Sequence, residues 1–258
     1  MSGLMDNFWA APPVARTLAA AVFVTSVGVR LLGVIPAGWL YLDPYHLVTP
    51  PPQIWRLATN FLVSGPQLGI VLDPYFLFSY LKQLETSNPK FSKKEDVVWY
   101  LMTVSTMILV LNYLSGTNAP FCLQGLILAL AYTGTQDQRG QQASFFFLTI
   151  PAQLVPYAML FATLVMAGPD QLFIQMCGLV AAHLHDFLFR IWPEFGGGRN
   201  ILATPEFMSE AMQMIGLGER SYGAVYYGGG SGRTTGSSAG SGPLPDSWKT
   251  RGTGHRLG

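Results

Sequence analysis

One short stretch of the sequence has the residue types of a hydrolase nucleophile. Residues 236–240 match the pattern Gly-x-Ser-x-Gly, with Ser238 at its centre. This pattern supports catalysis only where the serine sits on a turn between a strand and a helix, backed by a base. Here it lies in a Gly- and Ser-rich segment, where chance matches are common. We therefore do not expect Ser238 to be catalytic.

The four histidines are not spaced as a metal site. His46 and His255 stand far apart in the chain, and His183 and His185 are two residues apart, which points them to different faces of a helix. The sequence therefore predicts neither a metal nor another cofactor.

Asp73, Asp186 and Arg190 are among the ionisable residues that lie in apolar segments, where a charge is costly and often functional. Asp186 and Arg190 are spaced i to i+4 and can pair on one helix face as a structural anchor. Asp73, which Pro74 follows, either lines a water-filled cavity or ends an interfacial turn. The sequence leaves these two interpretations open.

His183 directly follows Gly178-x-x-x-Ala182, which places two small residues one helical turn apart. Such a face allows another helix to approach closely in a membrane. We expect Gly178 and Ala182 to pack against a neighbouring helix and His183 to be a hydrogen-bonded core histidine.

The elements that must position these residues are apolar segments of membrane length. Hydrophobic residues make up 50% of the chain and charged residues 11%, against roughly 25% charged in ordinary soluble domains. We predict an all-α membrane protein with six transmembrane helices. The predicted spans are residues 17–35, 68–84, 97–114, 120–134, 143–166 and 171–191.

Basic residues are distributed unevenly around these spans. Six spans place both termini on one side, and every Lys and Arg falls on that side except Arg30, inside the first span, and Arg56. By the positive-inside rule both termini are cytosolic. The first span is too long for the core of a signal peptide and should remain as an anchor. A net charge of +1 gives no reason to expect nucleic-acid binding.

The predicted regions are a cytosolic segment (1–16), the membrane domain (17–191), a juxtamembrane segment (192–221) and a tail (222–258). The tail is rich in Gly and Ser, so we expect it to be disordered and cytosolic. Cys122 and Cys177 both fall in predicted spans and should be apolar packing residues without a disulfide. The aromatic loop 36–67 should lie at the membrane interface, where membrane lipid would contact it.

Several motifs, in order along residues 8–207, resemble one known family. They are Trp55-Arg56 after a Pro-rich stretch, Leu84-Glu85, the segment 178–183, and the segment 197–207 with the sequence Gly-Gly-Arg-Asn-Ile-Leu-Ala-Thr-Pro-Glu-Phe. Together they resemble the Derlins, the endoplasmic-reticulum members of the rhomboid superfamily. The resemblance implies a six-helix rhomboid-like bundle in the endoplasmic-reticulum membrane, in which the helix with Gly178 and Ala182 pairs with the fourth helix.

The resemblance also implies that proteolysis has been lost. Rhomboid proteases carry Gly-x-Ser-Gly at the start of the fourth helix and a histidine base in the sixth. Here the fourth span opens with Asn-Ala-Pro-Phe-Cys-Leu-Gln-Gly (118–125) and has no serine. His183, the candidate for the histidine position, then has no nucleophile to activate, and neither Cys122 nor Ser115 has the motif context.

The last seven residues, Gly-Thr-Gly-His-Arg-Leu-Gly, are similar to the SHP box by which Derlins bind the valosin-containing-protein type AAA ATPase. The resemblance assigns this role to Gly252, Gly254, Leu257 and Gly258. Trp55 and Arg56 should anchor the loop 36–67, with the indole at the interface and the guanidinium on loop carbonyls or lipid phosphates.

The function that the resemblance implies is retrotranslocation of misfolded proteins from the endoplasmic reticulum to the cytosol. The expected partners are the misfolded substrates, a membrane RING ubiquitin ligase complex and the AAA ATPase. The fourth span, at about 15 residues and roughly 22 Å, is shorter than the roughly 27 Å hydrocarbon core and favours a thinned bilayer. The alternatives are an intramembrane protease with an unrecognised nucleophile and a small transporter.

Overall fold

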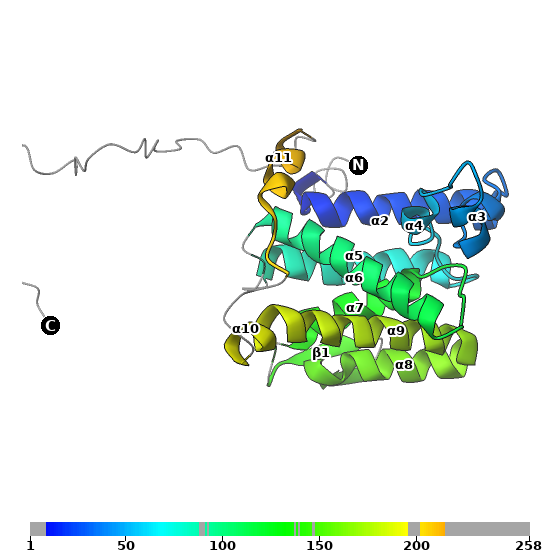
Figure 1. The fold of residues 1–258 in the computed structure, drawn as a ribbon. Helices are drawn as coiled ribbons and strands as arrows, with labels where there is room; N and C mark the ends of the chain where they lie inside the picture. Colours follow the sequence, from blue (N-terminus) through cyan, green and yellow to red (C-terminus); the bar gives the residue numbers. More distant parts are fainter. Residues whose placement is uncertain are drawn as a thin grey trace, which may run out of the picture. The chain divides into compact units, whose positions relative to one another are not determined.

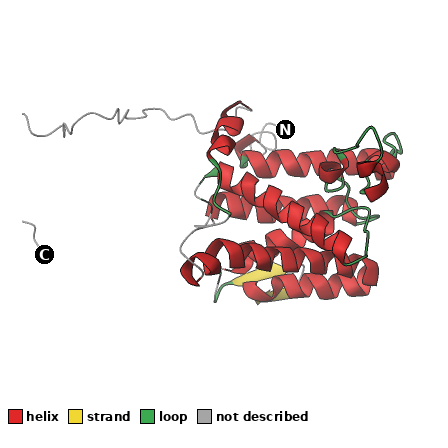
Figure 2. Ribbon diagram, in the orientation of Figure 1, coloured by secondary structure: helices red, strands yellow, loops and turns green. Residues whose placement is uncertain are grey.

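Helices form most of the part of the chain that the structure describes, as its apolar periodicity predicts, and a two-stranded hairpin accompanies them there (Figure 2). The computed structural model describes residues 9–87, 91, 93–136, 138, 140–145, 148–195 and 202–214. All of them belong to one compact unit, Met1–Glu219.

The first helix, α2 (Pro13–Ser26), continues into a π-helical turn, η1 (Val27–Leu31). Proline at its first helical position removes only an N–H that would have had no partner in the helix. A long excursion follows with three short helices, η2 (Ala37–Trp39), α3 (Pro44–Val48) and α4 (Arg56–Thr59). These lie at the opposite end of the bundle from α10 and α11 (Figure 1).

The next two helices run the length of the bundle. Helix α5 (Gly69–Ser87) packs against α2, and α6 (Lys94–Leu114) follows it. A capping box starts α6, since the carboxylate of Asp96 accepts from the Lys93 N–H at 3.1 Å. Glu85 near the end of α5 accepts from the free N–H groups of Val14 and Ala15 at 3.3 and 3.1 Å, and so caps α2 from a neighbouring helix.

Helix α7 (Leu123–Gln136) is the centre of the bundle. It contacts α5, α6, α8 and α9, and nearly all of its side chains are buried. Its 14 residues span only about 21 Å. The predicted start at Pro120 is three residues too early, because the Pro120 carbonyl accepts instead from the Leu42 N–H at 2.8 Å in the long excursion.

The prediction of one helix over 143–166 is wrong in its first third. Strands β1 (Gln142–Phe145) and β2 (Leu148–Pro151) pair antiparallel, with Ala143 opposite Ile150. Only then do η3 (Ala152–Leu154) and α8 (Val155–Met166) begin. Aromatic and β-branched residues are common in strands, and Pro156 fits the first turn of α8 better than the interior of a longer helix.

The longest helical run is α9 (Pro169–Asp186), continued by η4 (Phe187–Ile191) and α10 (Trp192–Phe195). A last helix, α11 (Glu206–Met214), contacts α6. The Trp99 Nε1 donates to the Leu202 carbonyl at 3.1 Å, and the Thr204 hydroxyl donates to Asp96 at 2.7 Å. These bonds hold the segment before α11 on the start of α6.

Within the described ranges, three helices are long and apolar enough to cross a membrane: Pro13–Leu31, Lys94–Leu114 and Pro169–Phe195. Helix α5 carries Asp73, Lys82 and Glu85, while α7 and the apolar helix Ala152–Met166 are shorter. Large apolar side chains such as Val24, Phe161 and Val165 are exposed on the outside, as expected of a lipid-facing surface. The chain is a mostly helical membrane protein, with three clear candidate spans where the sequence predicted six.

Candidate functional site

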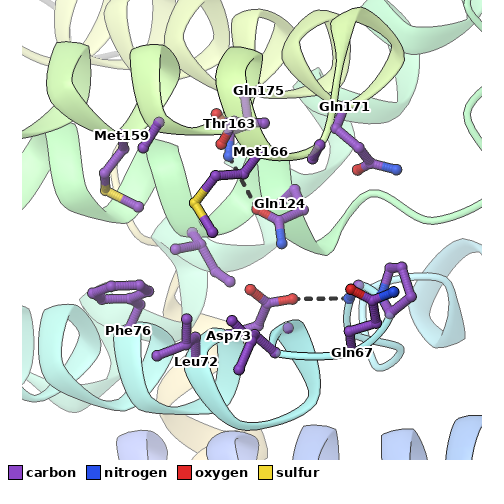
Figure 3. A pocket seen from close by; sticks show the side chains of 17 residues that line it. Gln67, Leu72, Asp73, Phe76, Gln124, Met159, Thr163, Met166, Gln171 and Gln175 are labelled. Carbon is purple, nitrogen blue, oxygen red and sulfur yellow. Dashed lines mark hydrogen bonds between the residues drawn. The ribbon is translucent and has the colours of Figure 1, made fainter.

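A cavity of 430 Å³ lies between α5, α8 and the start of α9 (Figure 3). Its volume falls in the range of small-ligand sites. The lining comes from the loop before α5, the first turns of α5, α7 and α9, and the end of α8. These segments meet at the same end of the bundle as α3 and α4 (Figure 1).

A line of polar side chains from three helices crosses this cavity. Asp73 of α5, only 6% exposed, accepts from the Gly65 N–H at 2.8 Å. The Gln124 amide of α7 faces the same carboxylate across the cavity (Figure 3). Gln175 of α9 then donates through Nε2 to Gln124 Oε1 at 3.0 Å (Figure 3). Of the two meanings left open for Asp73, the structure supports the one in which it lines a cavity.

The carboxylate sets the orientation of both amides. A carboxylate only accepts, so Gln124 must offer it the NH₂ group, which leaves Gln124 Oε1 to accept from Gln175. Gln175 Oε1 is then left over. It is buried and has no hydrogen-bond partner within the described part of the chain.

The rest of the cavity wall is apolar and adaptable. Leu72, Phe76, Met159 and Met166 line it together with the polar side chains (Figure 3). The Tyr80 hydroxyl approaches Met159 Sδ at 3.7 Å and so links α5 to α8. Methionine has three flexible torsions and a polarisable sulfur, which lets such a wall fit ligands of different shape.

The rhomboid motif Gly-x-Ser-Gly can be placed on the start of α7 by its last glycine. When Gly-x-Ser-Gly is placed on this chain by its last glycine, Gly125, the serine position falls on Gln124. The α9 residue that meets Gln124 is Gln175, eight residues before His183. A carboxamide is neither a nucleophile nor a base at neutral pH.

His183 lies outside the cavity and is exposed on α9, so the expectation of a core histidine is wrong. Its ring packs against Tyr132 with centroids 4.2 Å apart. Ser115 donates to the Asn112 carbonyl at 3.1 Å, and Cys122 lies 3.7 Å from the Asn112 amide. Among the hydrogen bonds of the described residues, none joins Ser115 or Cys122 to an imidazole.

The small-residue face of α9 lies against α7. A Cβ placed on Gly178 would overlap the Gly125 carbonyl and would stand 2.7 Å from the Gly125 Cα. A Cβ placed on Gly125 would in turn stand 2.7 Å from the Ile174 carbonyl oxygen. Ala182 is also buried. Only glycine permits this approach, which is what brings Gln124 and Gln175 within hydrogen-bonding distance.

Arg56 organises the long excursion between α2 and α5. It is 3% exposed, and its guanidinium donates to the Gly38 and Tyr41 carbonyls at 2.7 and 2.8 Å and to Gln53 Oε1 at 2.7 Å. Trp55 is 51% exposed, and its indole donates to the Trp39 carbonyl at 3.3 Å. Of the two kinds of partner expected for the guanidinium, the structure shows loop carbonyls.

Helix α3 in the same excursion is capped by Asp43. Its carboxylate accepts from the Tyr45 N–H at 2.9 Å and contacts His46 Nδ1 at 2.8 Å. The Tyr45 N–H, followed by the His46 ring, holds the pKa of Asp43 below its ordinary value of 3.8. The cap thus strengthens the short helix when the carboxylate is ionised.

The other residues singled out in the sequence are an ion pair in α9 and η4 and four residues of the tail. Asp186 and Arg190 pair at 3.5 Å, as their spacing predicts. The tail residues Gly252, Gly254, Leu257 and Gly258 lie outside the described residues. No group of three or more His, Cys, Asp or Glu suited to a metal occurs in the described part of the chain.

Sequence reasoning missed the central pair of this site. Gln124 and Gln175 lie 51 positions apart, and no local spacing connects them. The available signal was an amide side chain in each of two apolar helices, Gln124 in α7 and Gln175 in α9, since polar side chains there usually bond across helices.

Comparison with known proteins identifies the family of this chain. The model of the Der1-like family matches residues 11–206. Human Derlin-1 is 30% identical over 214 residues, covering 81% of this chain and 82% of that protein. Derlin-2.1 of Zea mays is 30% identical over 208 residues, with 76% and 81% covered, and Derlin-2.2 of Arabidopsis thaliana is 31% identical over 209 residues, with 76% and 83% covered. The resemblance stated from the motifs is thus confirmed, and the chain belongs to the Der1-like family, that of the Derlins.

Proposed function

We propose that this chain is a catalytically inactive rhomboid-like protein that helps move misfolded proteins from the endoplasmic reticulum to the cytosol. Family membership implies a role in endoplasmic-reticulum-associated degradation. The observation that carries the non-proteolytic part is the carboxamide of Gln124 at the serine position of the motif, hydrogen-bonded to the amide of Gln175 and not to a histidine.

The cavity receives a segment of the substrate in this account. Its lining comes from the loop before α5, the end of α8 and the start of α9, and α5 and α8 line its two sides. Its polar line offers hydrogen bonds that lipid tails cannot, which lowers the cost of bringing a polar segment into the membrane. Helix α7, at about 21 Å, is shorter than the roughly 27 Å core of this bilayer and favours local thinning.

The proposed topology has six spans with both termini in the cytosol. This orientation follows from the basic residues, which gather at the termini and in the loops on the same side. It places the end with the cavity toward the lumen and the C-terminal tail in the cytosol. A membrane RING ligase and an AAA ATPase of the valosin-containing-protein type would then receive the substrate there.

The fate of a misfolded lumenal reporter tests this function. In cells that lack the endogenous protein, expression of this chain should restore degradation of the reporter. When the proteasome is inhibited, full-length, ubiquitinated reporter should accumulate in the cytosol. Gln124→Ala removes the amide at the serine position. Because this account expects no cleavage by the chain, the variant and the unmodified chain should both leave the reporter uncleaved. Reporter fragments that depend on this chain would instead identify it as a protease.

A further inference from the structure

Among the lining residues that the structure describes, one side chain is acidic and none is basic. Asp73 contributes a carboxylate, and Gln175 contributes a buried carbonyl oxygen without a partner. No Lys, Arg or His is among the lining residues that the structure describes, and Asp73 has no ion pair within the same part of the chain. Its carboxylate accepts a hydrogen bond from the Gly65 N–H and faces the Gln124 amide.

Such an arrangement favours a cationic hydrogen-bond donor. A carboxylate held among apolar side chains is stabilised by an opposite charge more than the same group would be in water. The ammonium of Lys carries three donors and the guanidinium of Arg carries five, enough to bond Asp73 and a second acceptor together. Phe76, Met159 and Met166 add an aromatic ring and polarisable sulfurs, which also suit a cation and its aliphatic stem.

We propose that the cavity selects apolar membrane segments that carry a Lys or Arg, with Asp73 pairing with the cation. This inference rests on the proposed function, since it names the class of segment that the same cavity receives. A basic residue within a membrane segment is costly unless it is paired, and a correctly assembled protein pairs it. An unpaired Lys or Arg is therefore a chemical mark of an unassembled or misfolded membrane protein, and Asp73 provides the missing partner.

Charge distinguishes this occupant from other apolar ligands. A segment with norleucine in place of Lys keeps the length and the apolar stem but loses the cation. A segment with Glu in that position brings a like charge beside Asp73. The expected order of affinity is Lys or Arg, then norleucine, then Glu.

The test uses the purified full-length chain in lipid nanodiscs. Photoreactive peptides of about 20 Leu and Ala residues, long enough to span, carry Lys, norleucine or Glu at the position level with Asp73, and binding and crosslink sites are measured. The Lys peptide should bind at least about tenfold more tightly than norleucine, the lower range for a charged hydrogen bond, and should crosslink to cavity residues.

Two variants of equal charge change separate the cavity from general electrostatics. Asp73→Asn retains an oxygen for the Gly65 N–H, so it should fold and should bind the Lys and norleucine peptides equally. Asp170→Asn removes an exposed carboxylate in the first turn of α9 that is not among the cavity residues, and should preserve the preference for Lys.

Each other outcome has a definite meaning. Equal binding of the Lys, norleucine and Glu peptides to the unmodified chain would overturn the selection while cavity crosslinks still supported the proposed function. Peptides that crosslink nowhere in the cavity would overturn both. A preference for Lys that disappears in Asp170→Asn, or survives in a folded Asp73→Asn protein, would also overturn the pairing with Asp73.

Discussion

Gly178 of α9 and Gly125 of α7 lie backbone against backbone, with no room for a side chain on either residue. This contact places the two helices that carry Gln175 and Gln124 close enough for a 3.0 Å amide hydrogen bond. The hydrogen bond between the two amides in the cavity therefore depends on the close packing of the two glycines.

Side chains added at this crossing should destabilise the bundle. Gly178→Ala and Gly125→Ala each force the helices apart, at a cost of about 1–3 kcal/mol typical of overpacking, and Gly178→Leu should lower the amount of folded protein. Gly134→Ala, on the same helix α7, is the control because its Cβ would stand 3.6 Å from Gln83, an ordinary contact. Thermal unfolding in detergent measures all four. Equal midpoints for Gly125→Ala and Gly134→Ala would contradict the close crossing.

Replacement of Arg56 should loosen the excursion between α2 and α5. Arg56→Ala removes three charged hydrogen bonds from a buried site, and we expect a loss of about 3 kcal/mol or more. Together with Trp55→Ala it should stall degradation of a misfolded lumenal reporter. Limited proteolysis within residues 36–67 and the reporter half-life are the measurements.

Arg30→Ala is the matched control for that experiment. Arg30 is exposed at the end of η1, and its guanidinium carbon lies 5.2 Å from the centre of the Phe121 ring. Its loss should cost about 1 kcal/mol or less. If Arg56→Ala were as protease-resistant as Arg30→Ala, the buried guanidinium would not be the organiser of this segment.

Features that depend on residues close together in the sequence could be predicted, whereas contacts between distant segments could not. Apolar runs correctly predicted the positions of α2, α6 and α9, because each is a long local pattern. The stretch 143–151 has the same apolar content but pairs as strands, a tertiary choice that composition does not reveal. The Gly178 face was visible from spacing within one helix, whereas its partner Gly125 and the line from Asp73 to Gln175 join separate helices and required the fold.

Acid should release the cap of α3. Because the pKa of Asp43 is lowered in the folded chain, its carboxylate stabilises the helix above the ordinary value of 3.8, and this contribution is lost as the pH falls through the lower, folded value. The amide NMR signal of Tyr45 should therefore show an acid titration whose midpoint lies below 3.8. Asp43→Asn should remove that titration. A midpoint above 3.8 would contradict the assigned cap.

Removal of the last residues should weaken association with the AAA ATPase. Deletion of 252–258 removes Gly252, Gly254, Leu257 and Gly258, the residues that resemble the ATPase-binding box. The expected result is lower recovery of the ATPase in affinity purification with unchanged membrane insertion. Deletion of 228–234 removes equally many residues from the same Gly-rich tail and should leave recovery unchanged. Equal recovery after both deletions would show that the motif match is accidental.

The most direct test of the central claim is to place a photocrosslinking amino acid in the cavity while a misfolded client is being degraded. At Thr163, which lines the cavity, the probe should capture intact client, and client variants with an added membrane Lys should be captured more. At Phe161, exposed on the outer surface of the same helix α8, it should capture mainly lipid or other neighbours. Capture of intact client at Thr163 well above Phe161 is the predicted result. Equal capture at the two positions, or capture of cleaved client at Thr163, would contradict a non-proteolytic cavity that receives substrate.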